Sequence, residues 1–266
     1  MLGAILGDII GSRFEFSNTA INKDFKLYTK DSTYTDDTVM TLAIADALMC
    51  VNNRSDENEV KTMIIQKMKE YGHRYPFAGY GYSFRKWLFS ESDQPYGSYG
   101  NGSAMRVSAI GYMYDNLEDT INAARWSAEV THNHIEGIKG ATVTAAIIFL
   151  ARSGKNKKYI SEYIKNNYDY DIDTPLSVLS SRNEHIESCM DSLPKSIVSF
   201  LEGNSFIEVI RNAVSLGGDT DTIGAIAGAV AESYYGIPHE YDYIYLNELD
   251  DDMLETIVKF KSFINN

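Results

Sequence analysis

Two segments of this chain begin with paired aspartates and continue as strongly apolar helices. Residues 35–38 (TDDT) precede VMTLAIADALMC, and residues 219–222 (DTDT) precede IGAIAGAVAESYYG. The first of these helices is apolar on nearly every face, which is typical of a helix buried inside a protein. A buried carboxylate without a partner is destabilising by several kcal/mol. A fold that buries both helix starts therefore has to supply a partner for these carboxylates.

Helix capping is the structural alternative for each cluster. Thr35 is a favourable N-cap residue, and an Asp in the first turn stabilises a helix by about 0.3–1 kcal/mol through the helix dipole. Capping is the better explanation of one such cluster, but two clusters at buried helix starts favour a bound cation. Carboxylate and hydroxyl oxygens suit Mg²⁺, Mn²⁺ or Ca²⁺, and no His/Cys cluster indicates zinc or copper. Two divalent ions would balance the charges of Asp36, Asp37, Asp219 and Asp221.

Helical periodicity recurs along the chain and predicts an all-α fold. The expected helices span residues 36–50, 57–71, 118–130, 136–152, 157–167, 193–202, 205–216, 220–235 and 248–264. Strand signals are limited to residues 25–29 and 241–245. No repeat or break in composition divides the sequence, so we expect a single domain over residues 1–266.

Residues 71–111 are rich in Gly and Tyr, and no apolar period holds there for long. Loops of this length inside a compact domain are usually functional or disordered, and the aromatic content argues against disorder. Aromatic side chains here could stack on a nucleobase, although such side chains fill cores more often. We therefore expect a functional segment, without assigning a stacking residue.

Charge and cysteine content restrict the partners and the compartment. The chain carries 24 Lys and Arg against 37 Asp and Glu, a net charge of −13, which repels nucleic acid and anionic lipid. Free nucleic acid and membrane surfaces are therefore poor partners. Cys50 and Cys189 lie far apart without a CxxC pair, which favours a reducing compartment such as the cytoplasm. Asp8 interrupts the apolar start where a signal peptide needs its apolar stretch, and no run reaches the length of a membrane span.

Five motifs carry a resemblance to a known family. GAILGDIIGSRFEF, YTDDTVMTLAIADAL, YGNGSAMRVSAIG, THNHIEGIKGA and SLGGDTDTIGAIAGAVA follow one another between residues 3 and 231. In these motifs and their order, the chain resembles the ADP-ribosylglycohydrolase family. The resemblance implies a compact all-α fold with a binuclear Mg²⁺ centre, in which Mn²⁺ is possible. It also implies cleavage of the bond between ADP-ribose C1″ and a protein side chain, with arginine and serine both open as acceptors. The partner would be an ADP-ribosylated protein or another ADP-ribose derivative.

The resemblance assigns roles to residues that match the family motifs. Glu15 matches a loop glutamate that gates the site and acts as acid or base. The metal ligands would be Thr35, Asp36, Asp37, Asp219, Asp221 and Thr222. Contacts to ADP-ribose would come from Gly100, Asn101, Gly102, Ser103, Ala104, Met105 and Arg106, together with His132, Gly217 and Gly218.

Each of these assignments has a structural alternative. Ser12 and Glu15 fit a helix capping box, and His132 at a helix end would ordinarily be a cap or a surface residue. A glycine-rich loop alone is weak evidence for ligand binding, and a Gly-Gly pair is often only a turn. His134 does not share a helical face with His132, so a two-histidine metal site is not expected. A catalytically silent ADP-ribose-binding or structural relative is the alternative to an enzyme, and the presence of every expected ligand disfavours it.

Overall fold

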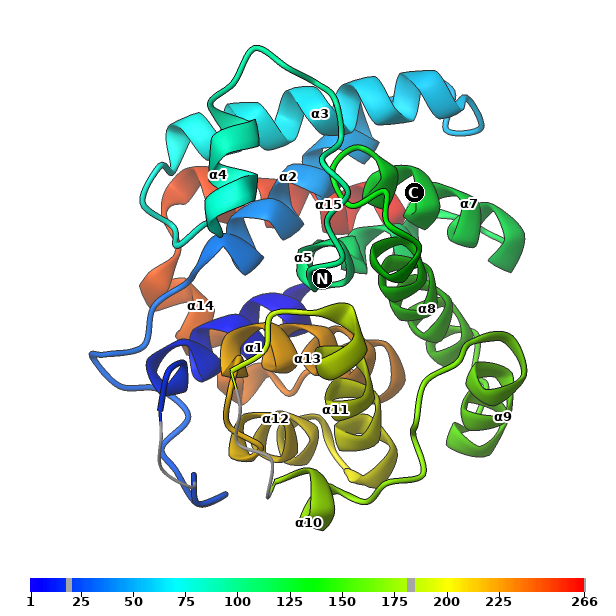
Figure 1. The fold of residues 1–266 in the computed structure, drawn as a ribbon. Helices are drawn as coiled ribbons and strands as arrows, with labels where there is room; N and C mark the ends of the chain where they lie inside the picture. Colours follow the sequence, from blue (N-terminus) through cyan, green and yellow to red (C-terminus); the bar gives the residue numbers. More distant parts are fainter. Residues whose placement is uncertain (18–20, 181–184, 266) are drawn as a thin grey trace.

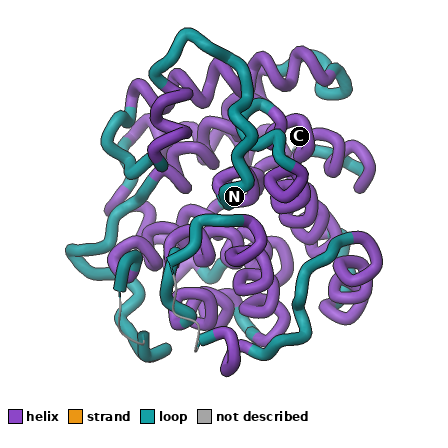
Figure 2. Tube along the Cα trace, viewed as in Figure 1, coloured by secondary structure: helices purple, strands orange, loops and turns teal. Residues whose placement is uncertain are grey.

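The chain folds into a bundle of helices in a computed structural model that describes residues 1–17, 21–180 and 185–265 (Figures 1 and 2). These residues contain no β-strand, only an isolated bridge between Gly100 and Ser188, which confirms the all-α prediction. The α-helices are α1 (Leu2–Gly11), α2 (Asp36–Cys50), α3 (Glu57–Arg74), α4 (Tyr82–Leu88), α5 (Gly102–Met105), α6 (Ile110–Met113), α7 (Leu117–Glu129), α8 (Ile135–Arg152), α9 (Lys157–Asn167), α10 (Leu176–Leu179), α11 (Cys189–Glu202), α12 (Phe206–Ser215), α13 (Thr220–Tyr235), α14 (Asp242–Glu248) and α15 (Asp251–Ile264). Three 3₁₀ turns, η1 (Ser12–Phe14), η2 (Arg106–Ala109) and η3 (His239–Tyr241), lie between them.

The two strand signals are wrong. Residues 241–245 lie at the end of η3 and the start of α14, where helical backbone bonds replace any ladder. Residues 25–29 form no strand, and side chains bind the carbonyls there. The Phe25 carbonyl accepts a hydrogen bond from Arg211 Nη1 at 2.9 Å, and the Lys26 carbonyl accepts one from Arg13 Nη2. A segment whose acceptors bind arginine side chains has no need of a neighbouring strand.

Helix α1 is absent from the predicted helices, because all ten of its residues are buried and no polar face marks a period. It packs directly on α13, and the two backbones touch (Figure 1). A Cβ atom on Gly7 would lie 2.0 Å from the Gly224 carbonyl oxygen, and one on Gly3 would lie 2.1 Å from that of Gly228. Only glycines permit this approach.

The contact between α1 and α13 is antiparallel and sets the position of the candidate site. Gly3 faces Gly228, and Gly11 lies against Thr220, so the end of α1 meets the beginning of α13. Buried apolar side chains from the whole bundle form one contiguous cluster around this pair. Within the described residues, no helix has both the length and the apolar character needed to cross a bilayer.

Candidate metal centre and substrate pocket

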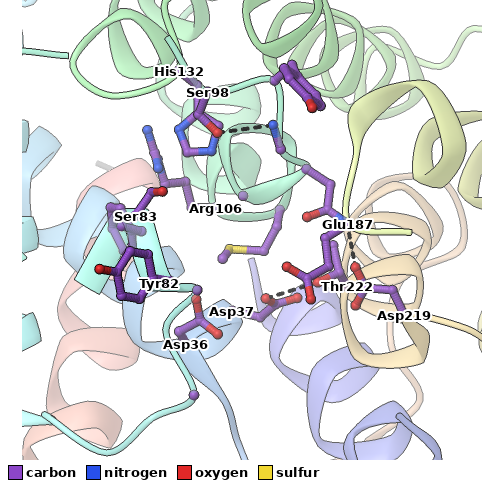
Figure 3. A pocket seen from close by; sticks show the side chains of 18 of the residues that line it. Asp36, Asp37, Tyr82, Ser83, Ser98, Arg106, His132, Glu187, Asp219 and Thr222 are labelled. Carbon is purple, nitrogen blue, oxygen red and sulfur yellow. Dashed lines mark hydrogen bonds between the residues drawn. The ribbon is translucent and has the colours of Figure 1, made fainter. Parts of the chain in front are cut away.

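The starts of α2 and α13 open into a cavity of about 530 Å³. Figure 3 shows Asp36 and Asp37 on one side of it and Asp219 and Thr222 on the other. The expected residues that line the cavity are Glu15, Asp36, Asp37, Gly100, Asn101, Gly102, Met105, Arg106, His132, Asp219, Asp221 and Thr222. The structure thus brings together two clusters that lie more than 180 residues apart in the chain.

Three carboxylates converge at the α13 side of this cavity. Glu15, Asp219 and Asp221 each offer an oxygen, and these oxygens lie within 4.8 Å of one another. Across from them, Thr222 Oγ1 donates a hydrogen bond to Asp37 Oδ1 at 3.3 Å. Among the described residues, the buried atoms Asp37 Oδ2 and Asp221 Oδ1 find no hydrogen-bond partner. Buried carboxylate oxygens without a donor, grouped at this spacing, fit the oxygen ligands that Mg²⁺ and Mn²⁺ prefer.

Burial makes this cluster electrostatically unfavourable for the protein alone. Loss of solvent, followed by the Asp219 charge, raises the pKa of Glu15 to about 7. Burial also raises the pKa of Asp36 to about 8, with further contributions from Asp8 and Asp219. The pKa of Asp221 lies well above its usual range, mainly through burial and then through Asp219. The carboxylates repel each other, and a bound dication would relieve this repulsion.

Asp8 supports the site from α1, a role that its place in the sequence does not predict. It lies fully buried on α1 and accepts hydrogen bonds from both the backbone N–H and the hydroxyl of Thr35 and of Thr38, at 2.6–3.0 Å. Burial raises the pKa of Asp8 to about 6, although these hydrogen bonds oppose the rise. Asp8 therefore ties the start of α2 to α1. The only sign of this role in the sequence is that Asp8 is the one charged residue in the apolar run of residues 2–11.

Capping accounts for part of the first cluster. Thr35 is the N-cap of α2, and its Oγ1 accepts a hydrogen bond from Asp37 N at 3.3 Å, which confirms that prediction. Thr35 is not among the residues that line the cavity, and its hydroxyl donates to Asp8 Oδ1 at 2.9 Å, which leaves the oxygen able to accept. Asp219 occupies the N-cap position of α13 but makes no side-chain cap. Its carboxylate faces the cavity instead.

The capping-box alternative for Glu15 is wrong. Ser12 follows the end of α1, where its Oγ donates to the Ile9 carbonyl at 3.1 Å and accepts from Thr33 N at 3.1 Å. No α-helix begins at this position for Ser12 to cap, because Ser12 is itself the first residue of the short 3₁₀ turn η1. Glu15 comes directly after that turn and joins Asp219 and Asp221.

Asn101 links the glycine-rich loop to the acidic cluster. Its Nδ2 donates to Asp219 Oδ2 at 2.6 Å and to Ser192 Oγ at 2.7 Å. One oxygen of Asp219 is thereby held in place, and the loop 100–102 is fixed beside the carboxylates. A substrate group that contacts this loop would lie next to the metal ligands.

Four residues that were expected to contact ADP-ribose do not line the cavity. Ser103 and Ala104 are buried away from the cavity lining, and Ser103 Oγ donates to the Gly137 carbonyl at 2.7 Å. Gly217 and Gly218 have φ angles of +70° and +76°, so they form the tight turn expected before α13, outside the lining.

Several residues at the mouth of the cavity were not predicted from the sequence. Phe16 is 67% exposed, and its ring centroid lies 4.6 Å from that of His185. Tyr82 at the start of α4 is 85% exposed, and Glu187 lines the opposite side (Figure 3). The Gly/Tyr-rich composition of residues 71–111 did indicate this face, but it did not single out a residue.

Comparisons with known proteins identify relatives of this chain. The family model described as ADP-ribosylglycohydrolase matches residues 1–257. Human ADP-ribosylhydrolase ARH3 is 28% identical in an alignment that covers 89% of this chain and 84% of that protein. ADP-ribosylarginine hydrolase Tri1 from Pseudomonas putida is 23% identical, with 89% and 70% covered. A solved structure called "ADP-ribosylglycohydrolase-related protein complex" superposes with a TM-score of 0.66 at 23% identity, over 97% of this chain and 94% of that one. The chain belongs to the ADP-ribosylglycohydrolase family.

Proposed function

We propose that this chain is a metal-dependent hydrolase that removes ADP-ribose from modified protein side chains by cleaving the bond at C1″. One observation carries the proposal. Glu15, Asp219 and Asp221 place oxygens within 4.8 Å of one another, in the cavity that also receives Asp36 and Asp37. A cavity that combines these carboxylates with a glycine-rich loop suits a ligand with both ribose hydroxyls and phosphates.

The metal ligands would be Thr35, Asp36, Asp37, Asp219, Asp221 and Thr222. Two Mg²⁺ ions, or Mn²⁺ in their place, would supply Lewis acidity and lower the pKa of a bound water. The unpartnered oxygens of Asp37 and Asp221 support this assignment. Asp8 would act indirectly, since it holds the segment that carries Thr35.

Glu15 would move the proton in the reaction. Cleavage at an anomeric carbon builds positive charge on the ribose and requires a proton for the leaving group. The pKa of Glu15, about 7, suits a group that gives and takes a proton near neutral pH. Asn101 would keep Asp219 oriented, and the loop 100–102 with His132 would bind the phosphates.

The compartment is part of the proposal. Cys50 and Cys189 are both free thiols, the first exposed and the second buried. Free thiols without a disulfide support a reducing compartment such as the cytoplasm. An ADP-ribosylated protein or an ADP-ribose derivative would be the partner there.

A panel of arginine-linked and serine-linked ADP-ribosyl peptides tests the function. We expect ADP-ribose to be released from at least one linkage with Mg²⁺ present, and EDTA to abolish the release. Asp221→Asn should lower turnover by at least about 100-fold without unfolding the protein, whereas Asp252→Asn, a surface substitution on α15, should leave it unchanged. Binding of ADP-ribose without release from either peptide would instead identify a catalytically silent relative. Release that persists in EDTA would contradict the metal requirement.

A further inference from the structure

Arg106 follows the glycine-rich loop and lines the cavity, but one nitrogen of its guanidinium already binds protein acceptors. The side chain is 1% exposed, and its Nη2 donates to the Ser127 carbonyl at 2.8 Å and to Thr131 Oγ1 at 2.9 Å. The guanidinium carbon lies 5.8 Å from the centroid of the Phe84 ring. These contacts direct the charge toward the end of α7 and toward Thr131. Through Nη2, Arg106 therefore has a task inside the protein besides lining the cavity.

The Thr131 hydroxyl lies between Arg106 and His132. Thr131 is fully buried, and its Oγ1 is 2.9 Å from Arg106 Nη2 and 2.8 Å from His132 Nδ1. A guanidinium only donates hydrogen bonds, so Oγ1 accepts from Arg106. The single hydroxyl proton is then left for another acceptor. In the described residues, His132 Nδ1 is the acceptor within reach of it.

The other ring nitrogen of His132 faces the glycine-rich loop. A Cβ atom on Gly102 would lie 3.4 Å from Nε2, and one on Gly100 would lie 3.5 Å from it. Nε2 has no hydrogen-bond partner within the described ranges, and His132 lines the cavity (Figure 3). Gly100 and Gly102 line it as well. The missing side chains at the two glycines leave room for a ligand atom beside Nε2.

We infer that Arg106 and Thr131 hold His132 as the neutral tautomer with its proton on Nε2, so that the ring offers one hydrogen-bond donor to an oxyanion lying against Gly100 and Gly102. The ligand's identity rests on the proposed function, which makes this oxyanion a phosphate oxygen of ADP-ribose. Burial and the nearby Arg106 charge lower the pKa of His132 well below its usual range, which agrees with a neutral ring. His132 thus binds and does not transfer protons, and Arg106 and Thr131 are positioning residues.

Long-range ¹H–¹⁵N correlation spectra of the imidazole nitrogens test the tautomer in the full chain, with the resonances assigned by a His132→Gln variant. We expect Nδ1 of His132 to be unprotonated and Nε2 to be protonated, with no change between about pH 8 and about pH 6. Thr131→Val removes the hydroxyl with little change of shape and should mix the tautomers. Thr131→Ser keeps the hydroxyl and should restore the wild-type spectrum.

Calorimetric titration with ADP-ribose provides the second measurement. Thr131→Val should weaken ADP-ribose binding by about 10-fold, as expected when a hydrogen bond to a charged group is lost, and Thr131→Ser should bind normally. Ser127→Ala is the matched control, because Ser127 Oγ has no partner while its carbonyl still accepts from Arg106.

A proton on Nδ1 in the wild type, or a Thr131→Val variant with an unchanged tautomer, would overturn the inference. If the wild type does not bind ADP-ribose, the proposed function fails, but the nitrogen spectrum still decides the tautomer by itself. The two failures are therefore distinguishable.

Discussion

Thr222 donates a hydrogen bond to Asp37 across a separation of 185 residues in the sequence. The bond joins the first turn of α13 to the first turn of α2, and it marks the place where the two acidic clusters meet. Ionised carboxylates are destabilising at either helix start, since burial raises the pKa of both Asp37 and Asp221 well above the usual range. The site is therefore a property of the packed bundle rather than of either helix.

Glu15→Gln should separate chemistry from binding. The amide keeps the size of the side chain but cannot transfer a proton, so we expect the turnover rate to fall by about 100-fold to 10,000-fold. ADP-ribose affinity, measured by calorimetry, should stay within about threefold of the wild type. Glu187→Gln, which changes a carboxylate at the cavity mouth, is the matched control. Full activity in Glu15→Gln would exclude this residue as the proton carrier.

Asp8→Ala should destabilise the protein more than most single substitutions. The change leaves two backbone N–H groups and two hydroxyls of Thr35 and Thr38 without their acceptor. We expect a loss of about 3–5 kcal/mol in the free energy of unfolding, measured by urea denaturation. Asp8→Asn retains one acceptor oxygen and should lose less. Equal stability of wild type and Asp8→Ala would show that Asp8 does not hold the start of α2.

Gly7→Ala should be strongly destabilising, because its methyl group would lie 2.0 Å from the Gly224 carbonyl oxygen. Backbone atoms on two buried helices cannot move apart without loosening the core, so we expect a loss of at least about 3 kcal/mol. Gly81→Ala is the control, since a Cβ atom there has no neighbour within 4 Å. Thermal denaturation of both variants is sufficient, and a Gly7→Ala protein as stable as Gly81→Ala would refute the close backbone contact.

Metal-free protein should lose stability as the pH rises through the acidic cluster's titration range. Glu15 and Asp36 have pKa values of about 7 and about 8 in the folded chain, above the usual carboxyl range. The folded state therefore binds more protons than the unfolded state from about pH 4 upward. Their contribution is fully present at low pH and is lost as the pH rises through 7 and 8. Melting temperatures in EDTA should show this decline.

Two comparisons isolate that effect from the titration of the rest of the surface. Asp36→Asn cannot take up the proton, so its melting temperature should fall less steeply with pH than that of the wild type. Mg²⁺ added at about pH 8 should raise the melting temperature of the wild type, because the ion binds only the folded chain. Parallel pH curves for wild type and Asp36→Asn would contradict the assignment.

Hydrophobic periodicity predicts most of the long helices correctly, and recognisable capping residues help to fix where some of them begin. The predicted spans 36–50, 157–167 and 220–235 coincide with α2, α9 and α13. Thr35 and Asn156 cap the first two of these helices with their side chains, and such caps can be recognised in a sequence. Helix α1 has no polar face and no side-chain cap, so nothing in the pattern distinguished it from an apolar start. In the sequence, Asp8 therefore stands out only as an interruption of an apolar run.

The convergence of the two acidic clusters could not be worked out from their spacing. It depends on glycines at positions 3, 7, 224 and 228, which allow α1 to lie on α13 and bring Glu15 beside Asp221, and on Asp8, which ties the start of α2 to α1. The resemblance to a family supplied that step. Arg106 shows a second limit, because a motif match indicates a ligand contact but gives no sign that the side chain also hydrogen-bonds to Ser127 and Thr131.

The pairing of α1 with α13 also determines when the native fold can be completed during synthesis. Helix α1 leaves the ribosome well before its partner surface, which lies more than 200 residues further along the chain. At typical elongation rates this delay is roughly 10 to 45 seconds. Throughout that interval a helix that is apolar apart from Asp8 lacks its matching surface on α13, so we expect nascent and truncated chains to need chaperones and to aggregate most readily.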